Sequence, residues 1–320
     1  MTTLTMRPFA GEADVPQIVD LLNICEAVDR LDQGTSISEI REDLSDPTLD
    51  VQRDLGVWED ADGTMVAFCR IYIPPAGDDL SSFIWFRIHP NLRWNYGLEA
   101  ELFGWASEQV REVGRQRGVP ARLRTGSISD NPQRIAMLEQ HGFKTVRYFM
   151  DMARPLADPL PEPQFPAGFT LRTLAGPEEV PAWVELFNLS FIDHWEHHDL
   201  TVEERLHWLT ESHYRPQHDL IAVADDGTFA AFCKCMITPK QNERTGRKEG
   251  WISLLGTRRG YRKLGLGRAM LLSGLRLLKA EGLDTALLGV DADSPTGATR
   301  LYESVGFKTT RTFIACMKDV

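Results

Sequence analysis

The chain contains an internal repeat that spans almost its whole length. Residues 6–16 and 171–181 have similar sequences at an offset of 165 positions. Asn23 aligns with Asn188 at the same offset, and two later pairs of short segments, at 67–69 and 142–143, align at 164. A constant offset over four separated anchors indicates duplication of a domain-sized unit, far longer than a solenoid repeat. The chain is therefore predicted to fold into two copies of one domain.

Length and composition also favour two domains rather than one. The chain has 320 residues, of which 42% are hydrophobic, enough for two cores. Five prolines lie between the copies, within residues 155–168, and predict a stiff, non-helical connection. We therefore expect an N-terminal lobe at residues 1–154, a linker at 155–168 and a C-terminal lobe at 169–320.

A basic, glycine-rich turn in the second copy carries the clearest chemistry. It runs from Gly256 to Arg268, between an apolar run of strand length and a helical pattern that ends at Gly282. Residues 244–268 contain eight basic side chains and one acidic one, although the whole chain has a net charge of −11. Glycines let a backbone approach a ligand closely, and a helix N-terminus presents free N–H groups to an anion. The turn is therefore predicted to bind a diphosphate.

Two motifs of the second copy resemble signatures of the GNAT N-acetyltransferase family. Arg262, Gly265 and Gly267 have the spacing of its acyl-CoA loop, and residues 298–307 resemble its Ala-x-x-Leu-Tyr-Glu-x-x-Gly-Phe ending. The resemblance implies an α/β (α+β) protein with two tandem acyl-CoA N-acyltransferase folds. Each would have a central mixed, mostly antiparallel sheet flanked by helices. It also implies acetyl-CoA as co-substrate and no metal.

The family resemblance also implies roles for individual residues. The strand before the loop would separate from its neighbour and present backbone N–H groups to the thioester, with Leu255 the expected donor to the carbonyl. Tyr302 matches the tyrosine that protonates the leaving thiolate, and an ordinary tyrosine pKa of about 10 keeps it protonated at neutral pH. Glu249 is the candidate general base, directly or through water, although related tandem enzymes place this glutamate nearer Trp251. The expected cofactor-binding residues are Leu255, Gly256, Thr257, Arg262, Lys263, Leu264, Gly265, Leu266, Gly267, Arg268, Ser294 and Arg300.

Each of these assignments has a purely structural alternative. Tyr302 could be a core aromatic side chain, and Glu249 could be a solvated carboxylate at a hairpin. The arginines could form a solvated face. Ser294 occupies a position at which relatives often carry an asparagine, so its hydrogen bond would have a shorter reach.

The first copy has lost the corresponding chemistry. Residues 89–99 keep Gly97, but Glu99 stands where the second glycine would be, so its carboxylate would face a bound diphosphate. Leu138 aligns with Tyr302 and has no hydroxyl group to donate. The N-terminal lobe is therefore predicted to be degenerate, and the C-terminal lobe catalytic.

Residues 191–199 contain three histidines and three acidic residues. No cysteine partner and no His-Glu-x-x-His spacing supports a metal site there. Contact with the acceptor and ordinary helix packing both remain open for this segment. Its acids, Asp193, Glu196 and Asp199, would suit a cationic amine.

Composition excludes several other classes of protein. No apolar run has membrane-spanning length, and residues 1–9 lack the features of a signal peptide, so we expect a cytoplasmic protein with no membrane partner. Five cysteines without a Cys-x-x-Cys pair are expected to be buried thiols. A sequence pI near 5.3 argues against general nucleic-acid binding. A monomer and a homodimer both remain open.

The expected function is therefore N-acetyl transfer from acetyl-CoA to a primary amine of a small molecule, by direct attack in a ternary complex. Two alternatives stay open at this point. One is a non-catalytic acyl-CoA-binding sensor or interaction module, and the other is a transferase for a longer acyl group or an aminoacyl group.

Overall fold

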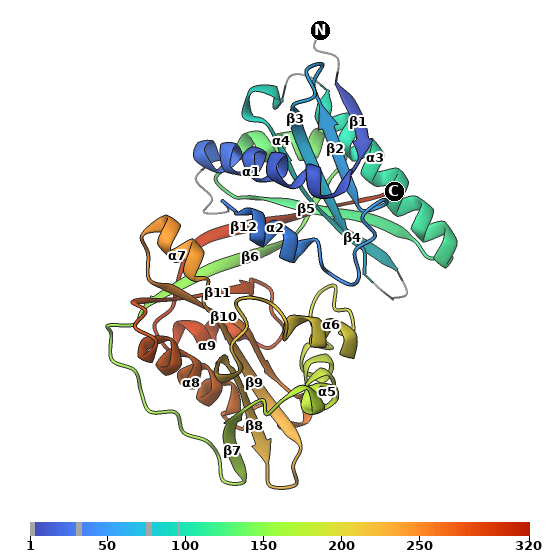
Figure 1. Cartoon of the computed structure of the whole chain (residues 1–320). Helices are drawn as coiled ribbons and strands as arrows, with labels where there is room; N and C mark the ends of the chain where they lie inside the picture. Colours follow the sequence, from blue (N-terminus) through green and yellow to red (C-terminus); the bar gives the residue numbers. More distant parts are fainter. Residues whose placement is uncertain (1–3, 30–33, 75–78, 95–96) are drawn as a thin grey trace. The chain divides into compact units, whose positions relative to one another are not determined.

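The computed structural model describes residues 4–29, 34–74, 79–94 and 97–320 (Figure 1). The chain divides into two compact units. Unit 1 consists of Met1–Val146 and Ile314–Val320, and unit 2 consists of Arg147–Phe313.

The sheet of unit 1 is antiparallel except at one pair of strands. Its first four strands pair antiparallel in chain order, and the fourth and fifth pair in parallel. The strands are β1 (Thr5–Pro8), β2 (Leu55–Glu59), β3 (Met65–Tyr72), β4 (Leu80–Ile88) and β5 (Ala121–Ile128). The helices are α1 (Val15–Asp29), α2 (Ile37–Asp43), α3 (Leu98–Arg117) and α4 (Pro132–Gln140), with a short 3₁₀ helix η2 (Pro90–Leu92).

Unit 2 repeats this arrangement. Its strands are β7 (Phe169–Thr173), β8 (Asp219–Ala224), β9 (Phe229–Met236), β10 (Glu249–Thr257) and β11 (Thr285–Asp291), antiparallel except for β10 with β11. The helices are α5 (Val180–Phe191), α6 (Val202–Trp208), α7 (Pro239–Thr245), α8 (Leu266–Ala280) and α9 (Ala298–Glu303), with a 3₁₀ helix η5 (Arg259–Tyr261). The predicted fold class, mixed sheets flanked by helices, is confirmed.

The units and the predicted lobes assign two segments differently. Residues 147–155 of β6 (Lys144–Pro155) belong to unit 2, because Phe149–Pro155 pair antiparallel with β11. Residues 314–320, at the end of the chain and mostly in β12 (Lys308–Asp319), belong to unit 1, where the N–H of Val320 donates to the carbonyl of Ala121. The last strand of the first copy thus completes the sheet of unit 2.

Each sheet carries a hydrophobic core on both faces. In unit 2, α8 covers one face with a cluster that includes Cys233, Ile252 and Met270. The other face is covered by α5 and α6, whose cluster includes Trp183 and Phe232 (Figure 1). The alternation of side chains along β9 explains this division, since Phe232 and Cys233 are neighbours in sequence and point to opposite faces.

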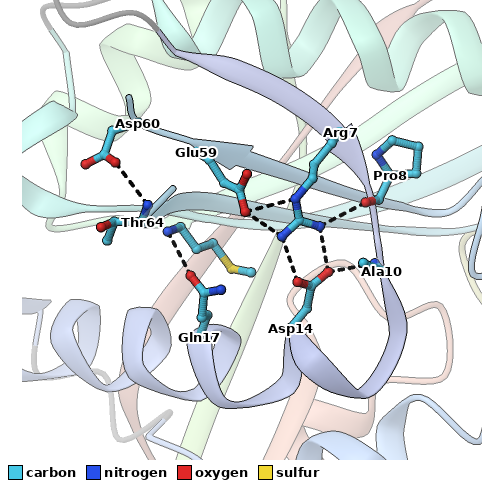
Figure 2. Close-up of polar contacts among 9 residues, drawn as sticks. Arg7, Pro8, Ala10, Asp14, Gln17, Glu59, Asp60 and Thr64 are labelled. Carbon is cyan, nitrogen blue, oxygen red and sulfur yellow. Dashed lines mark hydrogen bonds and ion pairs between the residues drawn. The ribbon is translucent and has the colours of Figure 1, made fainter. Parts of the chain in front are cut away.

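Small polar motifs are duplicated with the fold. Arg7 donates to both carboxylate oxygens of Asp14, at 2.8 and 2.7 Å, and also bonds Glu59 (Figure 2). Arg172 donates in the same way to Glu179, at 2.8 and 2.7 Å, 165 residues later. Such bidentate pairs fix the start of the first long helix to the first strand in each unit. No helix within the described ranges is long and apolar enough to cross a membrane.

Candidate functional site

A gap between two parallel strands forms the centre of the candidate site. Within residues 249–291, all of which are described, β10 pairs with β11 only over Glu249–Trp251. Beyond this point β10 follows β9 up to Thr257, whereas β11 follows β6. The register of β10 shifts at Ser253, a β-bulge that bends the strand where the two separate. The separation predicted from the family resemblance is therefore present.

The hydrogen-bond phase of β10 decides which backbone groups face this gap. The N–H of Arg258 donates to Ala230 on the β9 side at 2.9 Å. Opposed residues in an antiparallel ladder alternate between bonded and non-bonded pairs, so Gly256 also faces β9. Leu255 and Thr257 must therefore direct their N–H groups away from β9, toward the gap. The carbonyl of Thr257 agrees with this phase, because it accepts a hydrogen bond from Arg262 rather than from β9.

The glycine-rich turn leads from β10 into α8. Gly265 is the N-cap of α8 and has a φ of 93°, a left-handed conformation that favours glycine. Its position offers no side-chain cap, so the first N–H groups of the 15-residue helix keep no side-chain acceptor. A Cβ on Gly267 would lie 3.6 Å from Thr257 Oγ1 and 3.7 Å from Leu301 Cδ2, which are ordinary contacts. The protein itself therefore has room for a side chain at Gly267.

Tyr302 lies in α9 and is buried, with 8% of its surface exposed. It belongs to the core cluster that contains Cys233 and Leu266, and Leu255 packs against the same cluster. Its hydroxyl makes no hydrogen bond with any described residue, although its ring packs edge-on against Phe307. Burial, reinforced by the nearby Cys233 thiol, raises the pKa of Tyr302 well above its usual range. The phenol is therefore a proton donor over the whole physiological pH range.

Glu249 lies at the other end of β10. Its backbone N–H and carbonyl both bond the side chain of Asn242, and its carboxylate is 3.4 Å from Arg247. It precedes Leu255 by six residues, which corresponds to a separation on the order of 20 Å along an extended strand. A role as the base stays a prediction, and over this distance it would need a chain of waters.

The basic residues of the turn have partners within unit 2. Arg258 pairs with Glu185 at 3.0 Å, and Arg268 donates to Ser304 at 2.7 Å. Both Arg259 and Arg262 bond Asp193, and these bonds hold the pKa of Asp193 below its usual range.

The remaining predicted residues lie around this turn. Lys263 adopts a left-handed φ of 64°, and Leu264 is half exposed. Ser294 bonds Thr296 at 3.0 Å, and Arg300 is an exposed residue of α9. Contact of any of these residues with a diphosphate stays a prediction.

The histidine-containing segment follows α5 and is held by local contacts. His197 lies 3.1 Å from Asp199, and Trp195 packs against Phe149 with ring centroids 5.9 Å apart. The described part of the chain contains no group of three or more side chains that could hold a metal ion. Asp193, which the sequence suggested for a cationic amine, is instead bound to two arginines. This pairing was not predicted from the sequence, although the 164-residue offset aligns Asp193 with Asp29.

The chain is similar to known acetyltransferases in sequence and in structure. Residues 180–307 match the family described as Acetyltransferase (GNAT) family. The mycothiol acetyltransferase of Thermomonospora curvata is 30% identical over 293 residues, 91% of this chain and 90% of the relative. That of Frankia casuarinae is 32% identical over 229 residues, 69% of this chain but only 64% of the relative. A solved GCN5-related N-acetyltransferase from Sphaerobacter thermophilus has a TM-score of 0.73 and 26% identity, covering 99% of this chain and 95% of that one.

Proposed function

Because this chain belongs to the GNAT acetyltransferase family, we propose that it transfers an acetyl group from acetyl-CoA to the primary amine of a small molecule. The main support is the gap between β10 and β11, toward which the N–H groups of Leu255 and Thr257 point. A thioester carbonyl seated there would gain hydrogen bonds as its oxygen becomes negatively charged. Transfer would occur by direct attack within a ternary complex.

The donor would be held by the turn and the start of α8. The uncapped N–H groups after Gly265 suit a diphosphate, and the absence of a side chain on Gly267 lets a phosphate approach the backbone. The predicted contacts of Lys263, Arg268, Ser294 and Arg300 would add charge or hydrogen bonds around it. These residues support acetyl-CoA as the co-substrate, and we propose that no metal takes part in the reaction.

The reaction then needs a donor for the oxyanion, a proton for the departing sulfur and an acceptor for the proton that the amine loses. The neutral amine attacks the carbonyl carbon, forming the C–N bond, and the N–H of Leu255 stabilises the resulting oxyanion. The C–S bond breaks, and Tyr302 gives its proton to the departing sulfur and regains one from solvent before the next turnover. The proton lost by the amine passes to water, and from there to Glu249 if a chain of waters connects them.

Unit 1 would serve as a scaffold without acetyl-transfer activity of its own. Its Glu99 carboxylate stands in place of the second glycine, and Leu138 in place of the tyrosine. We place the protein in the cytoplasm, with no nucleic-acid or membrane partner, as a monomer or homodimer. The names of the relatives state the acceptor of those enzymes. For this chain we propose only that the acceptor is a small molecule with a primary amine.

Free-thiol release from acetyl-CoA in the presence of an amine panel tests this function. The panel should contain amino sugars, polyamines, aminoglycosides and peptide N-termini, with propionyl-CoA and a longer acyl-CoA as parallel donors. We expect release that depends on one class of amine and yields an acetylated product by mass spectrometry. Tight binding of acetyl-CoA without release for any amine would instead indicate an acyl-CoA sensor.

A further inference from the structure

The guanidinium of Arg262 is directed into the protein rather than toward a ligand. Its Nε donates to the carbonyl of Thr257 at 3.3 Å, and its Nη2 to the carbonyl of Ser190 at 2.8 Å. Its Nη1 donates to Asp193 at 2.7 Å. These acceptors belong to the end of β10, to α5 and to the segment just after α5. A planar guanidinium with fixed donor directions can join them at once.

Unit 1 repeats two of these three contacts. Arg93 follows η2 as Arg262 follows η5, and its Nε donates to the carbonyl of Ile88, the last residue of β4, at 2.8 Å. Its Nη1 donates to Asp29 at 2.7 Å. In both units the arginine therefore fastens the end of a central strand to the end of the first long helix.

The repeat matters because the corresponding helix of unit 1 carries a buried carboxylate where α8 has a glycine. Glu99 takes the place of Gly267 there, is 3% exposed, and accepts a hydrogen bond from the N–H of Trp94 at 2.7 Å. The Arg93–Asp29 pair is present although Glu99, whose carboxylate would repel a diphosphate, stands in place of Gly267. Diphosphate binding therefore does not explain why the arginine and its carboxylate are present in both units.

The conformation of the turn gives a reason for the contact. The residue after the arginine has a left-handed backbone in both units, with φ of 73° at Trp94 and 64° at Lys263. Neither residue is glycine, so this conformation costs energy that the surrounding contacts must offset. Bonds from the preceding arginine to a carbonyl and a carboxylate hold the turn at the point where the strain lies.

We propose that Arg262 and Asp193 are positioning residues that set the β10–α8 turn, and that the side chain of Arg262 is not itself a diphosphate ligand. The bond to the carbonyl of Thr257 orients a residue whose N–H faces the gap between β10 and β11. The same turn places Gly265 at the start of α8. Loss of the pair should therefore disturb the thioester position as well as the diphosphate position.

A truncated donor separates positioning from phosphate contact. S-acetylpantetheine carries the thioester but no diphosphate, so its reaction cannot depend on a phosphate ligand. The variants are Arg262→Lys, which keeps the charge but cannot span the three acceptors, and Asp193→Asn. We expect kcat/KM to fall by about tenfold or more with both acetyl-CoA and S-acetylpantetheine. A loss confined to acetyl-CoA, or a lysine variant with wild-type kinetics, would overturn the proposal.

A second measurement keeps the test independent of turnover, since the kinetic arm rests on the proposed acetyl transfer. Hydrogen exchange of residues 254–268 should be faster in both variants than in the wild type. Arg93→Lys is the matched control. In this variant hydrogen exchange should be faster at residues 88–94, and kcat/KM should be unchanged with both donors. If the wild type shows no thiol release, the proposed function is wrong, and the positioning role is still tested by the exchange measurement. Unchanged exchange at 254–268 would refute the positioning role whatever the activity.

Discussion

Glu99 accepts a hydrogen bond from the backbone N–H of Trp94 at 2.7 Å, so a carboxylate of unit 1 lies beside the N-terminus of α3. The corresponding helix of unit 2, α8, carries Gly267 at that position, and neither helix has a side-chain cap. A helix N-terminus attracts negative charge through its free N–H groups and its dipole. In unit 1 the first turn of the helix carries two acidic residues, Glu99 and Glu101, whereas the first turn of α8 carries none and is open to an anionic ligand.

Gly267→Glu should therefore give the start of α8 the same carboxylate that Glu99 gives the start of α3. We expect the wild type to bind one acetyl-CoA per chain and the variant to bind none detectably, because a built-in carboxylate would repel the diphosphate and fill its position. Isothermal titration calorimetry gives the stoichiometry directly. Two molecules bound per wild-type chain would show that unit 1 also holds a nucleotide, and the degenerate role of Glu99 would be wrong.

A smaller change at the same position tests close approach without charge. Gly267→Ala adds a Cβ that meets only ordinary contacts within the protein, so the melting temperature should stay within a few degrees of the wild type. The KM for acetyl-CoA should nevertheless rise by about tenfold, since a methyl group would separate the backbone from the diphosphate. Gly104→Ala in α3, where a Cβ would have no atom within 4 Å, is the matched helical control. An unchanged KM in Gly267→Ala would place the donor elsewhere.

The glycine turn could be predicted from the sequence because it depends on local patterns, whereas the gap was expected only from the family resemblance. A strand-length apolar run, a glycine pair and a helical periodicity follow one another between Trp251 and Gly282. The replacement of the second glycine and of the tyrosine in the first copy is also visible in the sequence, since alignment of the two copies places Glu99 and Leu138 there. These features need no knowledge of long-range contacts.

Features that depend on distant partners could not be predicted in this way. The bonds of Arg262 reach Asp193 and Ser190, 69 and 72 positions away, so its spacing to Gly265 gave no sign of them. The pairing of β6 with β11 likewise joins residues at least 130 positions apart. The prolines at 155–168 marked a connection without showing which sheet the preceding strand would enter. Only the tertiary structure supplies these contacts.

Tyr302→Phe tests the proton donor of the proposed reaction. The ring is buried and its hydroxyl bonds no described residue, so its removal should leave the fold and the affinity for acetyl-CoA nearly unchanged. We expect kcat to fall by roughly 10²–10³-fold, the range of a positioned general acid. Tyr148→Phe, at a half-exposed tyrosine of β6, is the control and should retain wild-type turnover. A kcat within twofold of the wild type in Tyr302→Phe would mean that the thiolate leaves without this proton.

Glu249→Gln should have a much smaller effect on turnover. Glu249 lies where β10 still pairs with β11, and the strand carries it away from Leu255, on the order of 20 Å at 3.3 Å per residue. We expect kcat to fall by less than about tenfold, below the range of a directly positioned base. A loss of about 100-fold with unchanged stability would show that the amine approaches from the Glu249 end of the strand.

Alkaline pH should weaken the fold through Tyr302. The native state favours its protonated form, since burial raises its pKa, whereas the unfolded chain releases this proton near the ordinary value of about 10. Stability from this group is thus fully present below pH 10 and declines as the pH rises above it. The slope should be about 1.4 kcal/mol per pH unit for one proton. Urea denaturation of wild type and Tyr302→Phe at pH 8, 10 and 11 measures it, because other titrating groups cancel in the difference. A free-energy difference between the two proteins that stays constant from pH 8 to 11 would show that the hydroxyl is solvated rather than buried in the core.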